Sequence, residues 1–76
     1  MRASQVSIGR TYAVKVSGRI VPVRLEGPSV FGGWNGTNLV SGRAVRVKTA
    51  GRLRYELEPT SGDELRRTGR EYRPVR

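Results

Sequence analysis

Apolar side chains recur at every second residue in two stretches near the start of the chain, residues 10–16 and 19–25. Those that would share one face are Tyr12, Val14, Val16, Val21, Val23 and Leu25. A period of two residues is typical of a strand with one buried face. The dipeptide Ser17-Gly18 between the stretches predicts a tight hairpin turn, because glycine tolerates positive φ. Pro22 lacks an N–H and is expected at a sheet edge or a bulge.

A second pair of strands is predicted at residues 34–39 and 43–48, with Ser41-Gly42 as the turn between them. Residues 16–24 and 40–48 read VSGRIVPVR and VSGRAVRVK, which agree at six of nine positions. We therefore expect two similar hairpins that pair into one curved sheet, whether the likeness comes from duplication or from convergence.

The segment between the two pairs, EGPSVFGG at residues 26–33, predicts a loop. Gly27-Pro28 should end the preceding strand, and the following glycines give the backbone freedom to turn. Phe31 near the loop tip is expected to pack against the sheet. Trp34, the single Trp of the chain, is expected in the core, and stacking on a ligand is its alternative use.

Residues 49–57 allow two interpretations. Leu53, Tyr55 and Leu57 alternate as in a last strand, and a short helical turn at residues 50–53 before that strand is equally compatible. Beyond Pro59 the chain is polar and has no apolar period, so residues 59–76 are expected to form a flexible tail. Within it, residues 61–64 resemble a capping box and allow one helical turn.

Together these elements predict an all-β fold, a small five-stranded SH3-like barrel. Residues 1–9 would lead in, residues 10–58 would form the barrel, and residues 59–76 the tail. Closing the sheet would hide edges that a short chain has little else to cover. An OB-like barrel is the alternative. The predicted core residues are Tyr12, Val14, Val16, Val21, Val23, Leu25, Trp34, Leu39, Val45, Val47 and Leu53.

Positive charge is concentrated in the part that is expected to fold. The 76 residues carry a net charge of +9, and residues 1–55 hold ten basic side chains and a single acid, Glu26. Residues 56–76 hold five of each sign, which cancel. Codon bias accounts for Arg over Lys but not for the missing acids. A positive field of this kind favours polyanions as partners.

The residue inventory argues against an enzyme. The chain has no Cys and no His, so thiol nucleophiles, the commonest general base and the commonest metal ligands are missing. Within residues 1–55 Glu26 is the single carboxylate, so no carboxylate pair can form there. The glycine-rich run at residues 32–36 lacks the Lys and the following helix of a phosphate-binding loop. We expect no cofactor and no metal. Without an apolar segment of membrane-spanning or signal-peptide type, the cytoplasm is the expected location.

The runs VSGRIVPVR and GGWNGTNLVSGRAVRVKTAGRLR resemble small SH3-like domains of bacteria and of their phages and plasmids. The run GWNGTNL at residues 33–39 is similar to plasmid-borne type II dihydrofolate reductases, which are also SH3-like barrels. This resemblance implies the barrel and a tendency to form oligomers. The active-site strand of that family aligns with residues 45–48. Arg46 and Lys48 stand there in place of the Gln that binds both ligands and the Tyr that lines the pore, so reductase activity is not expected.

The sequence thus predicts a binding module that contacts nucleic acid, DNA or RNA, without sequence preference. Its surface would be a cationic stripe on the outward side of the sheet, with an aromatic residue for stacking. The candidate residues are Lys15, Arg24, Arg46, Lys48, Arg52, Arg54 and Tyr55. The alternative is a protein-interaction or homo-oligomeric assembly module that uses the loop at residues 26–33 or a sheet edge.

Overall fold

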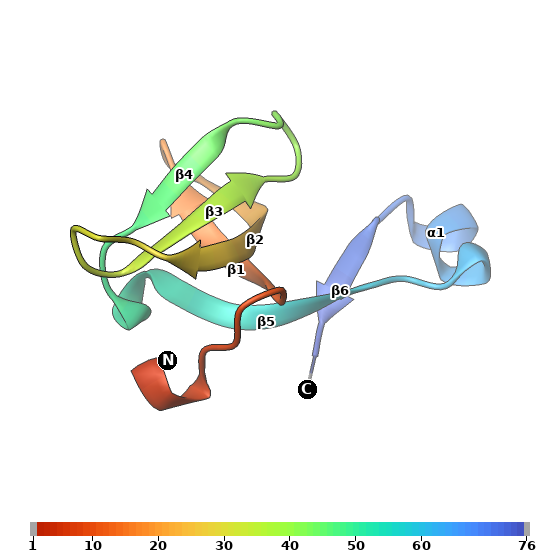
Figure 1. Ribbon diagram of the computed structural model, residues 1–76. Helices are drawn as coiled ribbons and strands as arrows, with labels where there is room; N and C mark the ends of the chain where they lie inside the picture. The colour runs from red at the N-terminus through yellow and green to blue at the C-terminus, as the bar shows by residue number, and fades with distance from the viewer. Residues whose placement is uncertain (1, 76) are drawn as a thin grey trace.

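The computed structural model describes residues 2–75 and joins their strands in one antiparallel sheet (Figure 1). The sheet has six strands in the order β4-β3-β2-β1-β5-β6. The elements are η1 (Ala3–Gln5), β1 (Thr11–Val16), β2 (Arg19–Pro28), β3 (Trp34–Asn38), β4 (Ala44–Val47), η2 (Ala50–Arg52), β5 (Leu53–Pro59), α1 (Gly62–Thr68) and β6 (Tyr72–Pro74). The all-β prediction is confirmed, with six strands in place of five.

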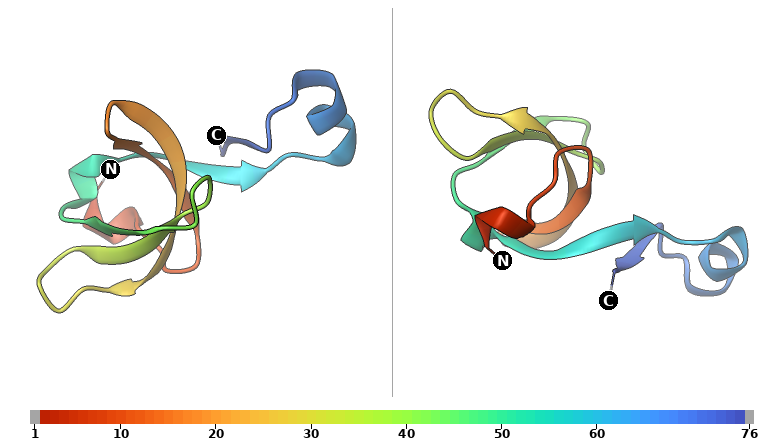
Figure 2. Two further views of the ribbon diagram at one scale, coloured as in Figure 1. Left: turned by 90° about the horizontal axis from the view of Figure 1, so that it is seen from above. Right: turned by 60° about the horizontal axis from the view of Figure 1, so that its bottom comes forward.

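The sheet is strongly curved, because a short connection joins strands that are far apart in its order. Residues 48–52 lead from β4 at one edge to β5, four strand positions away. A flat sheet would separate these strands by roughly 19 Å, whereas a connection of this length with a 3₁₀ turn spans about 16 Å. Figure 2 shows β1 to β4 and the start of β5 curling around a common interior. Among the described residues no ladder joins β4 to β5, so the sheet stays open.

A small apolar core fills the interior of the curl. Its central members, each at most 3% exposed, are Tyr12, Val14, Val23, Leu25, Val47 and Leu53. Partly buried side chains pack around them, namely Val6, Val16, Val21, Trp34 and Val45. The predicted core is confirmed except for Leu39, which lines a pocket on the other side of the sheet. The Tyr12 hydroxyl accepts a hydrogen bond of 2.9 Å from the Ser7 N–H and so ties the N-terminal segment to the core.

The first hairpin has the predicted turn, but its second strand is longer than predicted. Ser17 and Gly18 both have positive φ, at 50° and 81°, as a two-residue turn between twisted strands requires. The expected strand break at Gly27-Pro28 is wrong, since β2 continues through Pro28. A bulge between Leu25 and Gly27 absorbs Glu26 and lets the ladder to β3 resume beyond it.

The C-terminal segment is not the irregular tail that its polarity predicts. Its residues form α1 and then β6, which pairs with β5 (Figure 1). The N-cap of the predicted capping box is confirmed, because the Ser61 hydroxyl accepts a 3.2 Å hydrogen bond from the Glu64 N–H, whereas the Glu64 side chain pairs with Arg73. No residue of α1 is buried. Backbone pairing with β5 and the ion pair between Arg73 and Glu58 of β5 therefore hold this arm, and Arg73 also pairs with Glu64 of α1.

Candidate functional site

A bulge in β5 decides which of its side chains face the core. Val14 of β1 pairs with Leu53, but the residue before it in β1, Ala13, pairs with Tyr55, so Arg54 is the extra residue of β5. Directly opposed residues of an antiparallel pair point to the same face. Leu53 therefore faces the core with Val14, whereas Tyr55 faces outward with Ala13. The prediction that Leu53, Tyr55 and Leu57 share one face is wrong for this reason.

Lys15, Arg52 and Arg54 surround a hollow in the surface. They come from β1, η2 and β5, and the hollow, of about 400 Å³, is also lined by Gly18 and Gly51. We call these five residues the basic hollow. A side chain at Gly18 would meet nothing within 4 Å, and one at Gly51 would meet only the Thr49 hydroxyl at 3.8 Å. The two glycines thus leave the backbone of the hollow open to a ligand.

Carboxylates do not neutralise the basic hollow. Among residues 2–75 no salt bridge involves Lys15, Arg52 or Arg54. Five of the six acids are paired elsewhere: Glu56 with Arg10, Glu26 with Arg24, Asp63 with Arg66, and Glu58 and Glu64 with Arg73. The three cations of the basic hollow thus stand together without a carboxylate partner among the described residues.

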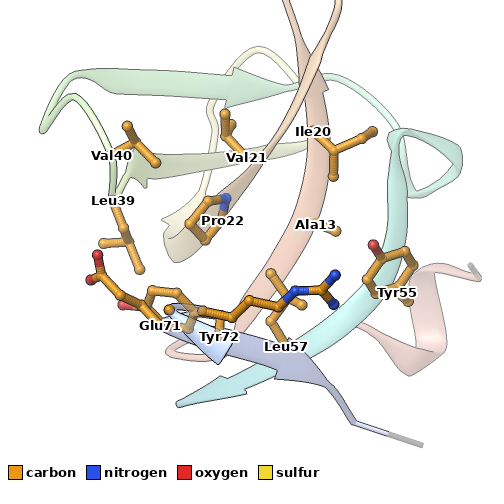
Figure 3. A pocket seen from close by; sticks show the side chains of 12 residues that line it. Ala13, Ile20, Val21, Pro22, Leu39, Val40, Tyr55, Leu57, Glu71 and Tyr72 are labelled. Carbon is orange, nitrogen blue, oxygen red and sulfur yellow. The ribbon is translucent and has the colours of Figure 1, made fainter. Parts of the chain in front are cut away.

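An apolar pocket of about 440 Å³ lies on the outer face, between the sheet and the C-terminal arm (Figure 3). We call it the outer groove. Its sheet residues include Ala13, Ile20, Pro22, Leu39, Tyr55 and Leu57, and its arm residues include Glu71 and Tyr72. Ala13 is fully buried, although it points away from the core. Tyr55 remains 42% exposed at the side of the groove.

The basic hollow and the outer groove are neighbours. Lys15 of the hollow pairs directly with Ile20 of the groove, which places their Cβ atoms about 5 Å apart. Arg54 of the hollow precedes Tyr55 of the groove in β5. A ligand of modest length can therefore contact both.

Two of the other three predicted cations, Arg24 and Arg46, have partners of their own. The Arg24 Nε donates a 3.1 Å hydrogen bond to the Glu26 carboxylate, which also accepts one from the Thr37 hydroxyl. Arg24 and then Thr37 lower the pKa of Glu26 below its ordinary value, because both hydrogen bonds favour the ionised form. Lys48 is exposed just beyond the end of β4.

Arg46 is held by the loop that precedes β3. It donates a 2.9 Å hydrogen bond to the Phe31 carbonyl, and its guanidinium lies 5.7 Å from the centre of the Phe31 ring. The expectation that Phe31 packs against the sheet is wrong, since its side chain is 78% exposed. The ring instead lies beneath the Arg46 cation.

The predicted cationic stripe is interrupted. Lys15 and Arg24 do share the outer face, as the strand pairing shows. Arg24 lies four residues beyond the partner of Lys15, which is about 13 Å along a strand. The row between them consists of the pair Ala13 and Pro22, both apolar. The structure thus brings Lys15, Arg52 and Arg54 together beside Tyr55 and leaves Arg24, Arg46 and Lys48 outside that group.

Sequence reasoning missed the outer groove, although a signal for it existed. Ile20 and Pro22 are apolar residues on the predicted outward side of their strand. Apolar residues at outward positions of neighbouring strands mark a surface that is available for binding. The residues of the arm, such as Tyr72, had no such signal, because their place depends on the pairing of β6 with β5.

Nothing in the described part of the chain provides a metal site of three or more His, Cys, Asp or Glu residues. Likewise, within residues 2–75 there is no helix with the length and apolar character needed to cross a membrane. Comparisons of the chain with protein-family models, curated proteins and solved structures find no match.

Proposed function

We propose that this chain is a small SH3-like barrel that binds nucleic acid without sequence preference, with the phosphate backbone at the basic hollow. The two hairpins, the loop after β2 and the turn η2 before β5 support the barrel, to which α1 and β6 would be additions. The observation that carries the function is the convergence of Lys15, Arg52 and Arg54 without a carboxylate partner among the described residues.

The chemistry of the hollow suits a phosphate. The planar guanidinium groups of Arg52 and Arg54 can each donate two parallel hydrogen bonds to phosphate oxygens, and Lys15 adds a mobile positive charge. Gly18 and Gly51 leave room for the anion to approach the backbone. None of these contacts reads a base, so the binding that they support is independent of sequence.

The proposal is one of binding without catalysis. Five of the six carboxylates of the chain are held in ion pairs outside the hollow. A general acid or base must lie within hydrogen-bond reach of the reacting group, and the residues that line the hollow include no carboxylate and no His.

The test is a fluorescence-anisotropy titration of labelled oligonucleotides of about a dozen nucleotides, at about 50 mM and 200 mM salt. With three phosphates bound, the affinity for a single strand should fall about twentyfold between these conditions. A variant with Lys15→Ala, Arg52→Ala and Arg54→Ala should lose most of the affinity and most of the salt dependence.

The matched control carries Arg2→Ala, Arg43→Ala and Arg67→Ala, which remove the same charge from exposed positions outside the hollow. It should bind within about twofold of the unchanged protein, since phosphate contacts act locally. Absence of binding at 50 mM salt would refute the function, and equal losses in both triple variants would refute the site.

A second candidate function is assembly through protein contacts. The loop between β2 and β3 presents Val30 and Phe31, which are 92% and 78% exposed, and β4 offers an open sheet edge. Light scattering over a range of protein concentrations tests it, and a monomer at every concentration would exclude self-assembly.

A further inference from the structure

We infer that the nucleic acid is single-stranded and that one of its bases enters the outer groove and stacks on Tyr55, while the adjoining phosphate occupies the basic hollow. This inference rests on the proposed function and specifies the ligand of the same site. It assigns a ligand to the outer groove, which the phosphate contacts do not involve.

The first argument is the position of the groove. Its residues Ile20 and Tyr55 are the cross-strand partner of Lys15 and the chain neighbour of Arg54. A phosphate held by these two cations is thus attached to a sugar at the mouth of the groove. The positive charge of the hollow attracts the phosphate, and the base attached to the same sugar can then enter the groove.

The second argument is the chemistry of the groove. Its floor is apolar, because Ala13, which has the smallest side chain apart from glycine, is paired there with Pro22 and Tyr55. Its volume of about 440 Å³ lies within the roughly 300–1,000 Å³ of sites for small organic molecules. Tyr55, half exposed on the wall, offers an aromatic face, and stacking on such a face is tolerant of base identity.

The third argument is the polarity of the two sides. Figure 3 shows Glu71 and Tyr72 across the groove from Tyr55. Arg70 also lines the groove on the arm side and offsets the charge of Glu71, whereas the basic hollow beside Tyr55 has no carboxylate, so phosphates are attracted most strongly to the Tyr55 side. The edge of a base carries amino and imino donors, and the Glu71 oxygens can accept hydrogen bonds from them.

These features favour a single strand over a duplex. Bases within a duplex are paired and stacked, and an enzyme or binding protein that takes one up must first extrude it at the cost of unstacking. In a single strand the bases are already accessible. The groove therefore adds affinity only for single strands, whereas the hollow alone attracts both forms.

The experiment compares four labelled ligands at about 50 mM salt: single-stranded DNA, single-stranded RNA, the matching duplex, and an abasic strand that keeps the phosphates and lacks the bases. The unchanged protein should bind at least one single strand about tenfold more tightly than the abasic strand or the duplex. Tyr55→Ser should remove that preference and leave the abasic strand and the duplex bound as before. Tyr55→Phe, which keeps the ring, should retain the preference.

The outcomes separate the inference from the proposed function. If the abasic strand and the duplex bind as tightly as the single strands, the stacking site is refuted while phosphate binding stands. The same holds if Tyr55→Ser leaves the affinity for the single strands unchanged. If none of the four ligands binds, both the stacking inference and the proposed nucleic-acid function are refuted. If Tyr55→Ser instead abolishes self-association of the chain, the groove belongs to a second copy and the inference is overturned. Circular dichroism of both variants checks that they fold.

Discussion

The hairpins β1–β2 and β3–β4 carry the same nine-residue pattern, residues 16–24 and 40–48, and end in different turns. In the first, Ser17 and Gly18 alone connect the strands, and Val16 pairs with Arg19. In the second, residues 39–43 form a longer loop, and Val40, the counterpart of Val16, is 73% exposed. The expectation that Ser41-Gly42 alone forms the second turn is wrong.

The valines that follow the turn nevertheless behave alike. Val23 and Val47 occupy corresponding places in the pattern, and both are at most 1% exposed. Val21 and Val45 correspond as well, and both pack partly buried against the core. The alternation of apolar and polar residues thus determines which face is buried, independently of the turn.

The turns differ because of a residue outside the pattern. The Asn38 side-chain oxygen accepts hydrogen bonds from the Val40 N–H at 2.9 Å and the Ser41 N–H at 3.3 Å. The Asn38 carbonyl also accepts one from the Gly42 N–H at 2.7 Å. Asn38, which is itself buried, therefore holds the second loop open, and a nearby polar side chain can override the preference of a turn sequence.

The largest expected effect tests the equivalence of the buried valines. Val23→Ala and Val47→Ala should each lower the free energy of unfolding by about 2–3 kcal/mol, because each removes two methyl groups from a filled core and leaves a cavity. Urea denaturation followed by circular dichroism measures this. A difference of more than about 1 kcal/mol between the two variants would contradict the equivalence, since additive packing alone predicts similar losses.

A smaller effect should appear in the second hairpin alone. Asn38→Ala leaves the N–H groups of Val40 and Ser41 without their acceptor, and we expect a loss of about 1–2 kcal/mol. Amide hydrogen exchange should accelerate at Val40 and Ser41 and stay unchanged at Gly18. Faster exchange in both turns to the same degree would show that Asn38 acts on the whole sheet and not on its own loop.

The smallest expected effect on the free energy of unfolding distinguishes Val16 from Val40, the first residues of the two nine-residue patterns. Val40→Ser should change the free energy of unfolding by less than about 0.5 kcal/mol, because the side chain is exposed. Val16→Ser should cost about 1 kcal/mol, since Val16 packs against the core. The same denaturation experiment measures both, and equal losses would mean that the turn difference has no energetic consequence.

Local patterns predicted most of the sheet, since each strand of the two hairpins shows its buried face within a few residues. Ten of the eleven predicted core residues belong to the core or pack against it, most of them identified by the twofold period, and Ser17-Gly18 identified the first turn. The bulges at Glu26 and Arg54 and the pairing of β6 were missed, because they depend on contacts between segments that are distant in the sequence.

The candidate site was predicted in part for the same reason. Composition and alternation correctly placed Lys15 and Arg24 on one face. They did not reveal that Arg24 is paired with Glu26, two residues away across a bulge, or that Arg46 is bound by the Phe31 carbonyl. Whether a cation is available depends on neighbours that only the folded chain brings near.

The extra residue in β5 changes the phase of the strand. Before Arg54 the odd-numbered side chain, Leu53, belongs to the core, and after it the odd-numbered side chains, Tyr55 and Leu57, belong to the opposite surface. The alternating residues Leu53, Tyr55 and Leu57 are thus divided between two surfaces. Leu53 packs in the core, and Tyr55 and Leu57 line the outer groove. Without the bulge, Arg54 would pair with Ala13 in regular alternation, and the assignments would be exchanged, with Tyr55 facing inward and Glu56 outward. In a chain of 76 residues, the bulge at Arg54 lets a single strand place apolar side chains both in the core and in the outer groove.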